Sequence, residues 1–416
     1  MYSKFEKYFF IDSAEMKFSK MLKYGSIFVV TMMVCFWGGI CVGGLLKGIS
    51  LQELLAEKGT KMVEYAGIML VGVVLIFPVV LLSVTAHEFG HFLFGRLSGY
   101  GFVSFRVLNW VLLRDNGRRR VKRFSIPGTL GQCLMAPPEK PISRIPSTAY
   151  FLGGVAMNLL LAAVAAVVWW YVPSESVVEK WIVVPSMLLL AIVNSFLLLT
   201  NGIPMCVGGI ANDGENALSM KKNTTEKMAF MLLLRINSAL QSGKRLKELP
   251  REWLADVEVA VAEGMLSRNL ALYKLALMCD LYQFQEALEL MEELHQSKQY
   301  TGILQYELEC EITFLSLVLG RKEQAMTLWN QKPLRRYTEE MQSSSSSKCR
   351  LLWAVAKYQE CDEAKAQRIF AHLQSHADDY LMVGEVKSDI AIIRHLTATD
   401  VPSEGEESET PAAGIH

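Results

Sequence analysis

The sequence predicts an all-α membrane bundle of four transmembrane helices with a small β-hairpin insert, followed by a soluble α-helical domain. Three observations lead to this prediction: long apolar runs in the first half, a β-rich stretch between them, and amphipathic helical periodicity in the second half. A chain of 416 residues exceeds one compact domain. Its hydrophobic content of 51% is too high for a wholly soluble protein.

Four apolar runs predict the transmembrane helices, because about 20 apolar residues are needed to cross the hydrocarbon core of a bilayer. The runs are residues 25–46, 65–86, 149–172 and 181–200. A polar segment, 1–23, precedes the first run, and no clear small-residue cleavage site marks its end. We therefore expect a retained helix and not a removable signal peptide. The membrane core should comprise residues 24–217.

Basic residues predict a multi-pass protein of the cell membrane with both termini in the cytoplasm, since short cytoplasmic loops collect Lys and Arg. Residues 96–144 contain ten Lys or Arg and two acids, and five lysines lie in the first 23 residues. Four crossings return the C-terminus to the side of the N-terminus. Because the formal net charge is zero, we expect the basic cluster at 118–123 to contact membrane lipids and not nucleic acid.

Residues 101–127 predict a cytoplasmic β-hairpin. Two β-rich segments flank Asn116-Gly117, a dipeptide that favours tight hairpin turns. The Pro-Gly at 127–128 and the Pro-Pro at 137–138 should end the hairpin and leave an irregular stretch. Two interpretations stay open: the hairpin offers a strand edge to an extended peptide, or it caps the helix bundle.

Residues 218–398 predict a cytoplasmic domain of amphipathic helices. Ala287, Ala325 and Ala364 lie in similar short motifs, at intervals of 38 and 39 residues. This period is typical of tetratricopeptide-like helical hairpins, and an irregular bundle is the alternative. Either form presents an extended surface on which a regulatory protein can bind. The acidic tail, 399–416, should be disordered.

His87, Glu88 and His91 form an HExxH motif at the end of the second apolar run. Residues four apart share one helix face, so both imidazoles can bind one tetrahedral metal ion. Glu88 lies close enough to activate a water molecule on that metal. Ionisable side chains are costly at membrane depth unless they face a polar interior, which argues against a chance occurrence. The motif predicts a zinc site.

A catalytic zinc usually has three protein ligands and one water, so a third ligand is required. Asp213, after the fourth apolar run, can supply it, and Glu215 is the alternative. In the third run Asn158 brings a buried amide that must find a partner. It either joins helices or polarises a substrate carbonyl, and Asn194 and Asn201 carry the same two alternatives.

Together these motifs resemble the site-2 protease family of intramembrane zinc metalloproteases. That family combines HExxH, GxxxN on the next helix, and NxxP followed by DG. This chain has, in the same order, His87–His91, Gly154–Asn158, Asn201–Pro204 and Asp213-Gly214. The resemblance covers residues 68–217. One departure is that Asp213 follows Asn201 by twelve residues, where the family usually has about eight.

The resemblance implies a zinc metalloendopeptidase that cleaves membrane-embedded or membrane-adjacent segments of protein or peptide precursors. It implies His87, His91 and Asp213 as Zn²⁺ ligands, Glu88 as general base, and Asn158 as a substrate-positioning or oxyanion residue. The alternative is a catalytically silent membrane scaffold that binds partners through its helical domain. A zinc transporter fits less well, because the other apolar runs contain no His or acidic residue.

Overall fold

The computed structural model describes residues 51–399, apart from 116–117, 125–128, 174, 208–209, 260–261 and 263. Contacts divide the chain into two compact units, which we describe separately. The first unit comprises residues up to 238 together with 263–267, and the second comprises 239–262 and the residues from 268 onward. The predicted span 25–46 and the acidic tail beyond 399 lie outside the described residues.

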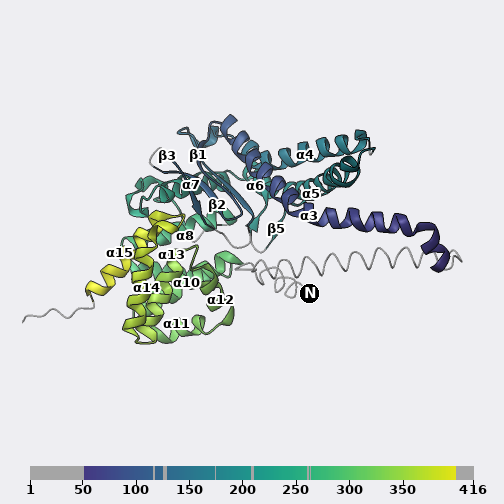
Figure 1. Cartoon of the computed structure of the whole chain (residues 1–416). Coiled ribbons are helices and arrows are strands. Elements are labelled where there is room, and N and C mark those ends of the chain that lie inside the picture. Colours follow the sequence, from purple (N-terminus) through teal and green to yellow (C-terminus); the bar gives the residue numbers. More distant parts are fainter. Residues whose placement is uncertain are drawn as a thin grey trace, which may run out of the picture. The chain divides into compact units, whose positions relative to one another are not determined.

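The first unit contains three long apolar helical segments, an antiparallel sheet and two shorter helices (Figure 1). Its helices are α3 (Leu51–Leu97), α4 (Thr148–Tyr171), α5 (Val184–Gly202), α6 (Asp213–Lys222) and α7 (Thr224–Gln241), with short turns η1 (Ile142–Arg144) and η2 (Glu179–Val183). Its strands are β1 (Gly101–Val107), β2 (Trp110–Asp115), β3 (Arg118–Arg123), β4 (Gly131–Ala136), β5 (Cys206–Val207) and β6 (Ile210–Ala211).

Three helices of the described chain are long and apolar enough to cross a membrane: Leu70–Leu97, Thr148–Tyr171 and Glu179–Gly202. Large apolar side chains on them are exposed, for example Val74 at 70% and Trp170 at 75%, as a lipid-facing surface requires. The helix that contains the second apolar run, 65–86, extends beyond that run. The helix continues to Leu97, so the HExxH motif lies inside the apolar helix and not at its end.

Two glycines bring α3 and α4 into backbone contact beside the HExxH motif. A Cβ atom at Gly90 would lie 2.2 Å from the carbonyl oxygen of Gly153, and one at Gly153 would lie 2.5 Å from that of Gly90. Small residues allow apolar helices to approach this closely. The approach places the start of α4 directly against the helix face that carries the two histidines.

The sheet has the order β3-β2-β1-β4, so the predicted hairpin is only part of it. β2 and β3 pair around Asn116-Gly117, with Asp115 opposite Arg118. The first predicted segment is two strands, because the chain turns at Leu108 with a φ of 53°. The prediction of an irregular stretch after Pro127-Gly128 is wrong, because β4 pairs with β1 and buries Met135 in the core.

The edge of β4 is partly occupied by side chains. Arg106 donates to the carbonyl oxygen of Gly131 (3.1 Å), and the Tyr150 hydroxyl donates to that of Cys133 (2.6 Å). An added strand would need these acceptors for its own amides. β3 is the other edge strand of the sheet, so a cap over the helix bundle and a strand edge for a peptide both stay open.

A buried cluster joins the sheet to α4, α6 and α7 beneath the HExxH helix. Its members are Tyr100, Val103, Cys133, Leu134, Met135, Ile145, Tyr150, Phe151, Ala217, Met220, Phe230, Met231 and Leu234. Phe230 on α7 lies 4.5 Å from Phe151 on α4, measured between ring centroids. α6 and most of α7 therefore belong to the first unit, whereas the sequence placed the boundary after residue 217.

The second unit is helical throughout its described part. Its elements are η3 (Leu246–Glu248), η4 (Arg251–Trp253), α8 (Met265–Asp280), α9 (Phe284–Gln296), α10 (Ile303–Val318), α11 (Lys322–Trp329), α12 (Lys332–Met341), α13 (Ser346–Ala354), η5 (Val355–Gln359), α14 (Glu363–Ser375), η6 (Ala377–Asp379) and α15 (Val383–Thr399). The first three residues of α8, Met265–Ser267, fall in the first unit.

Tight turns precede the three helices that carry the repeated motifs. Tyr282, Gly320 and Cys361 have positive φ, and each lies two residues before the first residue of its helix, α9, α11 and α14 respectively. Ala287 and Ala325 are buried as the repeat predicts, but Ala364 is exposed and Ala366 takes the buried position. The extra helix α12 lies between the helix pair α10–α11 and the helix pair α13–α14, so the pairs do not follow one another directly. A regular tetratricopeptide-like array therefore stays a prediction.

Charged side chains cluster between the helices of the second unit. Lys348, with no exposed surface, donates to Glu307 (2.8 Å), and Arg350 pairs with Glu311 and with Asp389 (3.2 Å to Asp389). Burial, followed by the charges of Asp389 and Glu307, raises the pKa of Glu385 to about 8 from its ordinary value of 4.5. A raised pKa means that the folded state holds a proton that the unfolded chain has lost.

We predict that the second unit loses stability as the pH rises from about 4.5 to 8, and that Glu385→Gln reduces this loss. Between pH 6 and pH 9 the unfolding midpoint should fall by at least about 3 °C more in wild type than in the variant, roughly 1 kcal/mol. Thermal unfolding followed by tryptophan fluorescence measures it. Glu363→Gln, at an exposed position of α14, is the control. Equal falls in wild type and Glu385→Gln would contradict the role of Glu385.

Candidate metal centre

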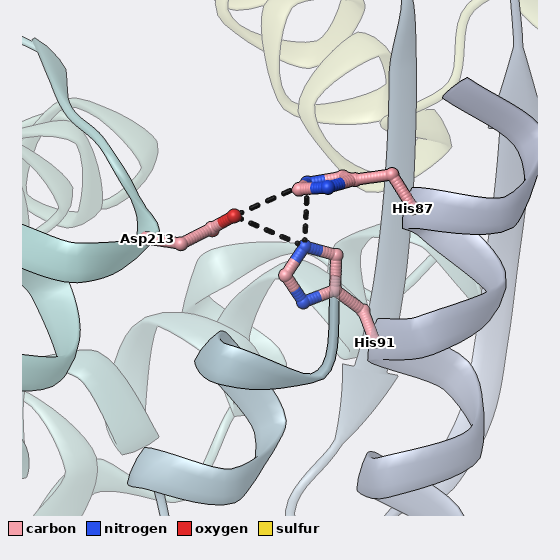
Figure 2. Close-up of side chains that lie close together, drawn as sticks. All are labelled: His87, His91 and Asp213. Atoms are coloured by element: carbon pink, nitrogen blue, oxygen red, sulfur yellow. Dashed lines mark hydrogen bonds and ion pairs between the residues drawn. The ribbon is translucent and has the colours of Figure 1, made fainter. Parts of the chain in front are cut away.

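His87 and His91 of α3 meet Asp213 of α6 at one point of the first unit (Figure 2). The two Nε2 atoms lie 3.1 Å apart. The Asp213 carboxylate oxygen Oδ2 lies 3.1 Å from Nε2 of His87 and 3.3 Å from Nε2 of His91. The structure therefore brings together the three side chains that the sequence singled out as ligands.

The triangle of ligand atoms has the dimensions of a tetrahedral metal site. Nitrogen and oxygen ligands lie about 2.0–2.1 Å from zinc, so two of them at the tetrahedral angle are roughly 3.3 Å apart. The three distances between the ligand atoms, 3.1, 3.1 and 3.3 Å, are close to that value. Three protein ligands leave the fourth position of a tetrahedron for water or substrate.

The hydrogen bonds of the two rings indicate that a cation belongs between them. Nδ1 of His91 donates to the backbone carbonyl of Tyr150 (2.8 Å), and Nδ1 of His87 donates to the side-chain oxygen of Asn158 (2.6 Å). Because a neutral imidazole carries only one N–H, both Nε2 atoms are then bare acceptors. Two bare nitrogens facing each other and a carboxylate repel, unless a metal ion or a proton lies between them.

Asn212 brings Asp213 to the histidines. It is the N-cap of α6, and its side chain accepts from the backbone N–H of Glu215 (2.9 Å). The same side chain donates to the carbonyl oxygens of Thr200 (2.7 Å) and Ile203 (2.6 Å), which fastens α6 to the end of α5. Asp213 is consequently held as the first residue of its helix.

The segment between Asn201 and Asp213, which is longer than in the family that the motifs resemble, contains a small hairpin. β5 and β6 pair between Asn201 and Asp213, with Cys206 opposite Ala211. A hairpin returns the chain to its starting point, so the extra length does not move Asp213 away. Glu215, the alternative ligand, accepts instead from Ser219 (2.8 Å) one turn further along α6.

Asp213 is ionised at neutral pH. Burial alone would raise its pKa, but when a proton lies between the carboxylate and the rings, the hydrogen bonds and charge of His87 and His91 outweigh burial and lower the pKa to about 2. The carboxylate is 17% exposed. It is therefore available as an anionic ligand across the physiological pH range.

Glu88, only 8% exposed, lies against the first residue of β4. A Cβ atom at Gly131 would lie 2.4 Å from the Oε1 atom of Glu88, so only glycine leaves room for this carboxylate. The buried guanidinium of Arg106 holds the loop before β4 through Thr129 and Gly131. Sequence reasoning missed Gly131 and Arg106, because it did not predict β4.

Gly154 provides the wall of the site on α4. A Cβ atom there would lie 2.6 Å from Cε1 of His87 and 2.7 Å from Nε2 of His91. The first residue of the GxxxN motif is thus in van der Waals contact with both rings. Any side chain at this position would occupy the space of the ligand atoms.

The three asparagines in the apolar helices have different surroundings. Asn158, fully buried, bonds to His87 and, through its Nδ2 atom, to Asn194 (2.7 Å). Both ends of its amide are engaged, which favours a role in holding His87 over the predicted oxyanion role. Asn201 donates to the backbone of its own helix, at Leu197 (3.0 Å).

Comparisons with protein-family models, with curated proteins and with solved structures found no match to this chain. The chemistry of the site therefore has to be judged from its own geometry. That geometry is a possible His-His-Asp metal site with a buried glutamate beside it, in a unit with three apolar helices.

We predict that Gly154→Ala lowers zinc affinity by at least about tenfold, because the added methyl group displaces both imidazoles. Zinc affinity is measured by competition with a chromophoric chelator on detergent-solubilised protein. Gly72→Ala in α3, where a Cβ atom meets nothing within 4 Å, is the matched control and should bind zinc as wild type does. Wild-type affinity in Gly154→Ala would contradict the placement of the two rings.

Proposed function

We propose that this chain is a zinc-dependent intramembrane endopeptidase of the site-2 protease type. Its substrate would be a membrane-embedded or membrane-adjacent segment of another protein or of a peptide precursor. The single observation that carries the proposal is the convergence of His87, His91 and Asp213 beside the buried carboxylate of Glu88. A structural metal would need no acid next to its ligands, whereas hydrolysis needs one.

In this proposal His87, His91 and Asp213 hold Zn²⁺. When bound, zinc lowers the pKa of a coordinated water to about 7 and polarises the carbonyl of the scissile bond. Glu88 would act as the general base, taking a proton from the attacking water, and would later deliver it to the leaving amine. Gly131 keeps space for the Glu88 carboxylate, and Asn158 fixes the orientation of the His87 ring.

The position of the site inside an apolar helix constrains the substrate. A helix in hydrocarbon satisfies its own backbone hydrogen bonds and hides its carbonyl groups, so the substrate segment must unwind locally before attack. In our proposal α3, α4 and α5 are membrane-spanning, and water reaches the site from the cytoplasmic side. The helical second unit would lie in the cytoplasm and bind a regulatory protein.

We predict that Glu88→Gln binds zinc with wild-type affinity but forms no cleavage products, because glutamine cannot take up a proton. Membranes from cells that express wild type or variant are compared by quantitative mass spectrometry for peptides with new termini in or next to apolar segments. Glu215→Gln, two residues from Asp213 but bonded to Ser219, is the control and should keep activity. Identical peptides from wild type and Glu88→Gln would remove the hydrolase proposal and leave the membrane scaffold.

We predict that Gly131→Ala also keeps the metal but slows cleavage by about 100-fold, the effect of misplacing a catalytic group by about 1 Å. The added Cβ atom would displace the Glu88 carboxylate without touching a ligand atom. The measurement is the rate of product formation in the membranes used for Glu88→Gln. At Gly101 in the same sheet a Cβ atom meets only ordinary contacts, 3.8 Å or more, so Gly101→Ala should be fully active. Full activity of Gly131→Ala would show that Glu88 acts elsewhere.

A further inference from the structure

We propose that a relay of two asparagine side chains, Asn194 and Asn158, sets the tautomer of His87 and so decides whether this ring can bind a metal. The relay connects three helices, since His87 lies on α3, Asn158 on α4 and Asn194 on α5. The inference rests on the proposed metal site but not on proteolysis. It assigns both asparagines as positioning residues, which touch neither substrate nor reacting atoms.

The relay starts at an acceptor that cannot change its role. The backbone carbonyl oxygen of Leu190 accepts a hydrogen bond from Nδ2 of Asn194 (2.8 Å). A carbonyl oxygen only accepts, so the NH₂ group of Asn194 must face it, and the Oδ1 atom of Asn194 must face the other way. Asn194 has no exposed surface, so water does not compete for these groups.

The orientation of Asn194 dictates the orientation of Asn158. Oδ1 of Asn194 accepts from Nδ2 of Asn158 (2.7 Å), so the NH₂ group of Asn158 points at Asn194. The Oδ1 atom of Asn158 is consequently left to face His87, where it accepts from Nδ1 (2.6 Å). The proton of the neutral ring is then on Nδ1, and the lone pair of Nε2 points at the metal site.

The opposite orientation would disable the ring. If the Asn158 amide were reversed, its NH₂ group would face Nδ1 of His87, and the ring proton would move to Nε2. A protonated Nε2 cannot bind a metal ion. The reversal would also set the Oδ1 atoms of Asn158 and Asn194 against each other, and reversing Asn194 as well would set its Oδ1 against the Leu190 carbonyl. In a buried site each such contact leaves polar atoms unsatisfied.

His91 has no need of a relay. Its Nδ1 atom donates directly to the backbone carbonyl oxygen of Tyr150 (2.8 Å), an acceptor that no side-chain substitution can reverse. His87 lies one turn earlier and depends on side chains alone. The site thus combines one ring fixed by the backbone with one fixed by two amides, and only the second is sensitive to substitutions outside the ligands.

Ser83 touches the relay without setting its direction. Nδ2 of Asn194 also donates to the Ser83 hydroxyl (2.9 Å), which in turn donates to the backbone carbonyl of Val79 (2.8 Å). Removing this hydroxyl leaves the bond from Asn194 to Leu190 in place. Ser83→Ala therefore removes a buried contact of the relay but keeps its polarity, which makes it a matched control.

Zinc affinity of the detergent-solubilised full chain, measured by chelator competition, tests the relay. Asn194→Leu should lower the affinity by about 10- to 100-fold, the usual effect of losing a group that orients a metal ligand. Ser83→Ala should bind zinc nearly as wild type does. In the double variant Asn158→Asp/Asn194→Leu the affinity should return, because a carboxylate at 158 only accepts and forces the proton onto Nδ1 whatever stands at 194.

Three results would overturn the relay: wild-type affinity in Asn194→Leu, a loss in Ser83→Ala as large as in Asn194→Leu, or a double variant no better than Asn194→Leu. A merely structural role predicts the last result, since a second substitution would not repair packing. Size-exclusion profiles and helix content confirm that each variant is folded. Should Asn194→Leu not fold, Asn194→Ala takes its place. Because the readout is zinc affinity, failure of the protease proposal leaves this test valid.

Discussion

Two bare imidazole nitrogens and a carboxylate oxygen face one another within 3.3 Å inside the first unit, and the rest of that unit depends on how their repulsion is relieved. In an apolar surrounding such a contact is far more unfavourable than in water. A cation at the centre reverses the sign of the interaction. Without a cation the three atoms repel one another and would move apart. With a metal ion between them, each of the three is attracted to the ion.

The elements around the triangle keep its corners at fixed spacing. Gly90 and Gly153 set the distance between α3 and α4, and Gly154 leaves room for both rings. Asn212 fastens the start of α6 to the end of α5 and so fixes the third corner. Beneath them a buried cluster joins the sheet to α4, α6 and α7. The site is therefore as rigid as the packing between these helices.

Local features of the site could be predicted from the sequence. The four-residue spacing of His87 and His91 places both on one helix face whatever the rest of the chain does. Asp213 was predicted as a ligand from the order of the motifs. The twelve-residue spacing between Asn201 and Asp213 is explained by the β5–β6 hairpin, which the sequence did not predict. Asn158 was expected to need a partner, but which partner it has depends on how α3 and α4 pack.

Features that rest on long-range packing could not be predicted. β4 was missed because it lies between the Pro-Gly at 127–128 and the Pro-Pro at 137–138, which predicted an irregular stretch. Its partner β1 also ends in a turn at Leu108 that no residue pattern predicts. With β4 unknown, the contact between Gly131 and Glu88 was invisible. In the second unit the third repeat was aligned on Ala364, although the buried alanine is Ala366, because two alanines two residues apart look equivalent in sequence.

X-ray absorption spectroscopy at the zinc edge of the purified, zinc-loaded protein tests the central claim most directly. Our account predicts one tightly bound zinc ion with about four nitrogen or oxygen neighbours at roughly 2.0–2.1 Å, including the outer-shell scattering of two imidazoles. Asp213→Ala should remove one oxygen neighbour or abolish binding. A zinc ion with sulfur neighbours, or a protein that retains no zinc, would contradict the account.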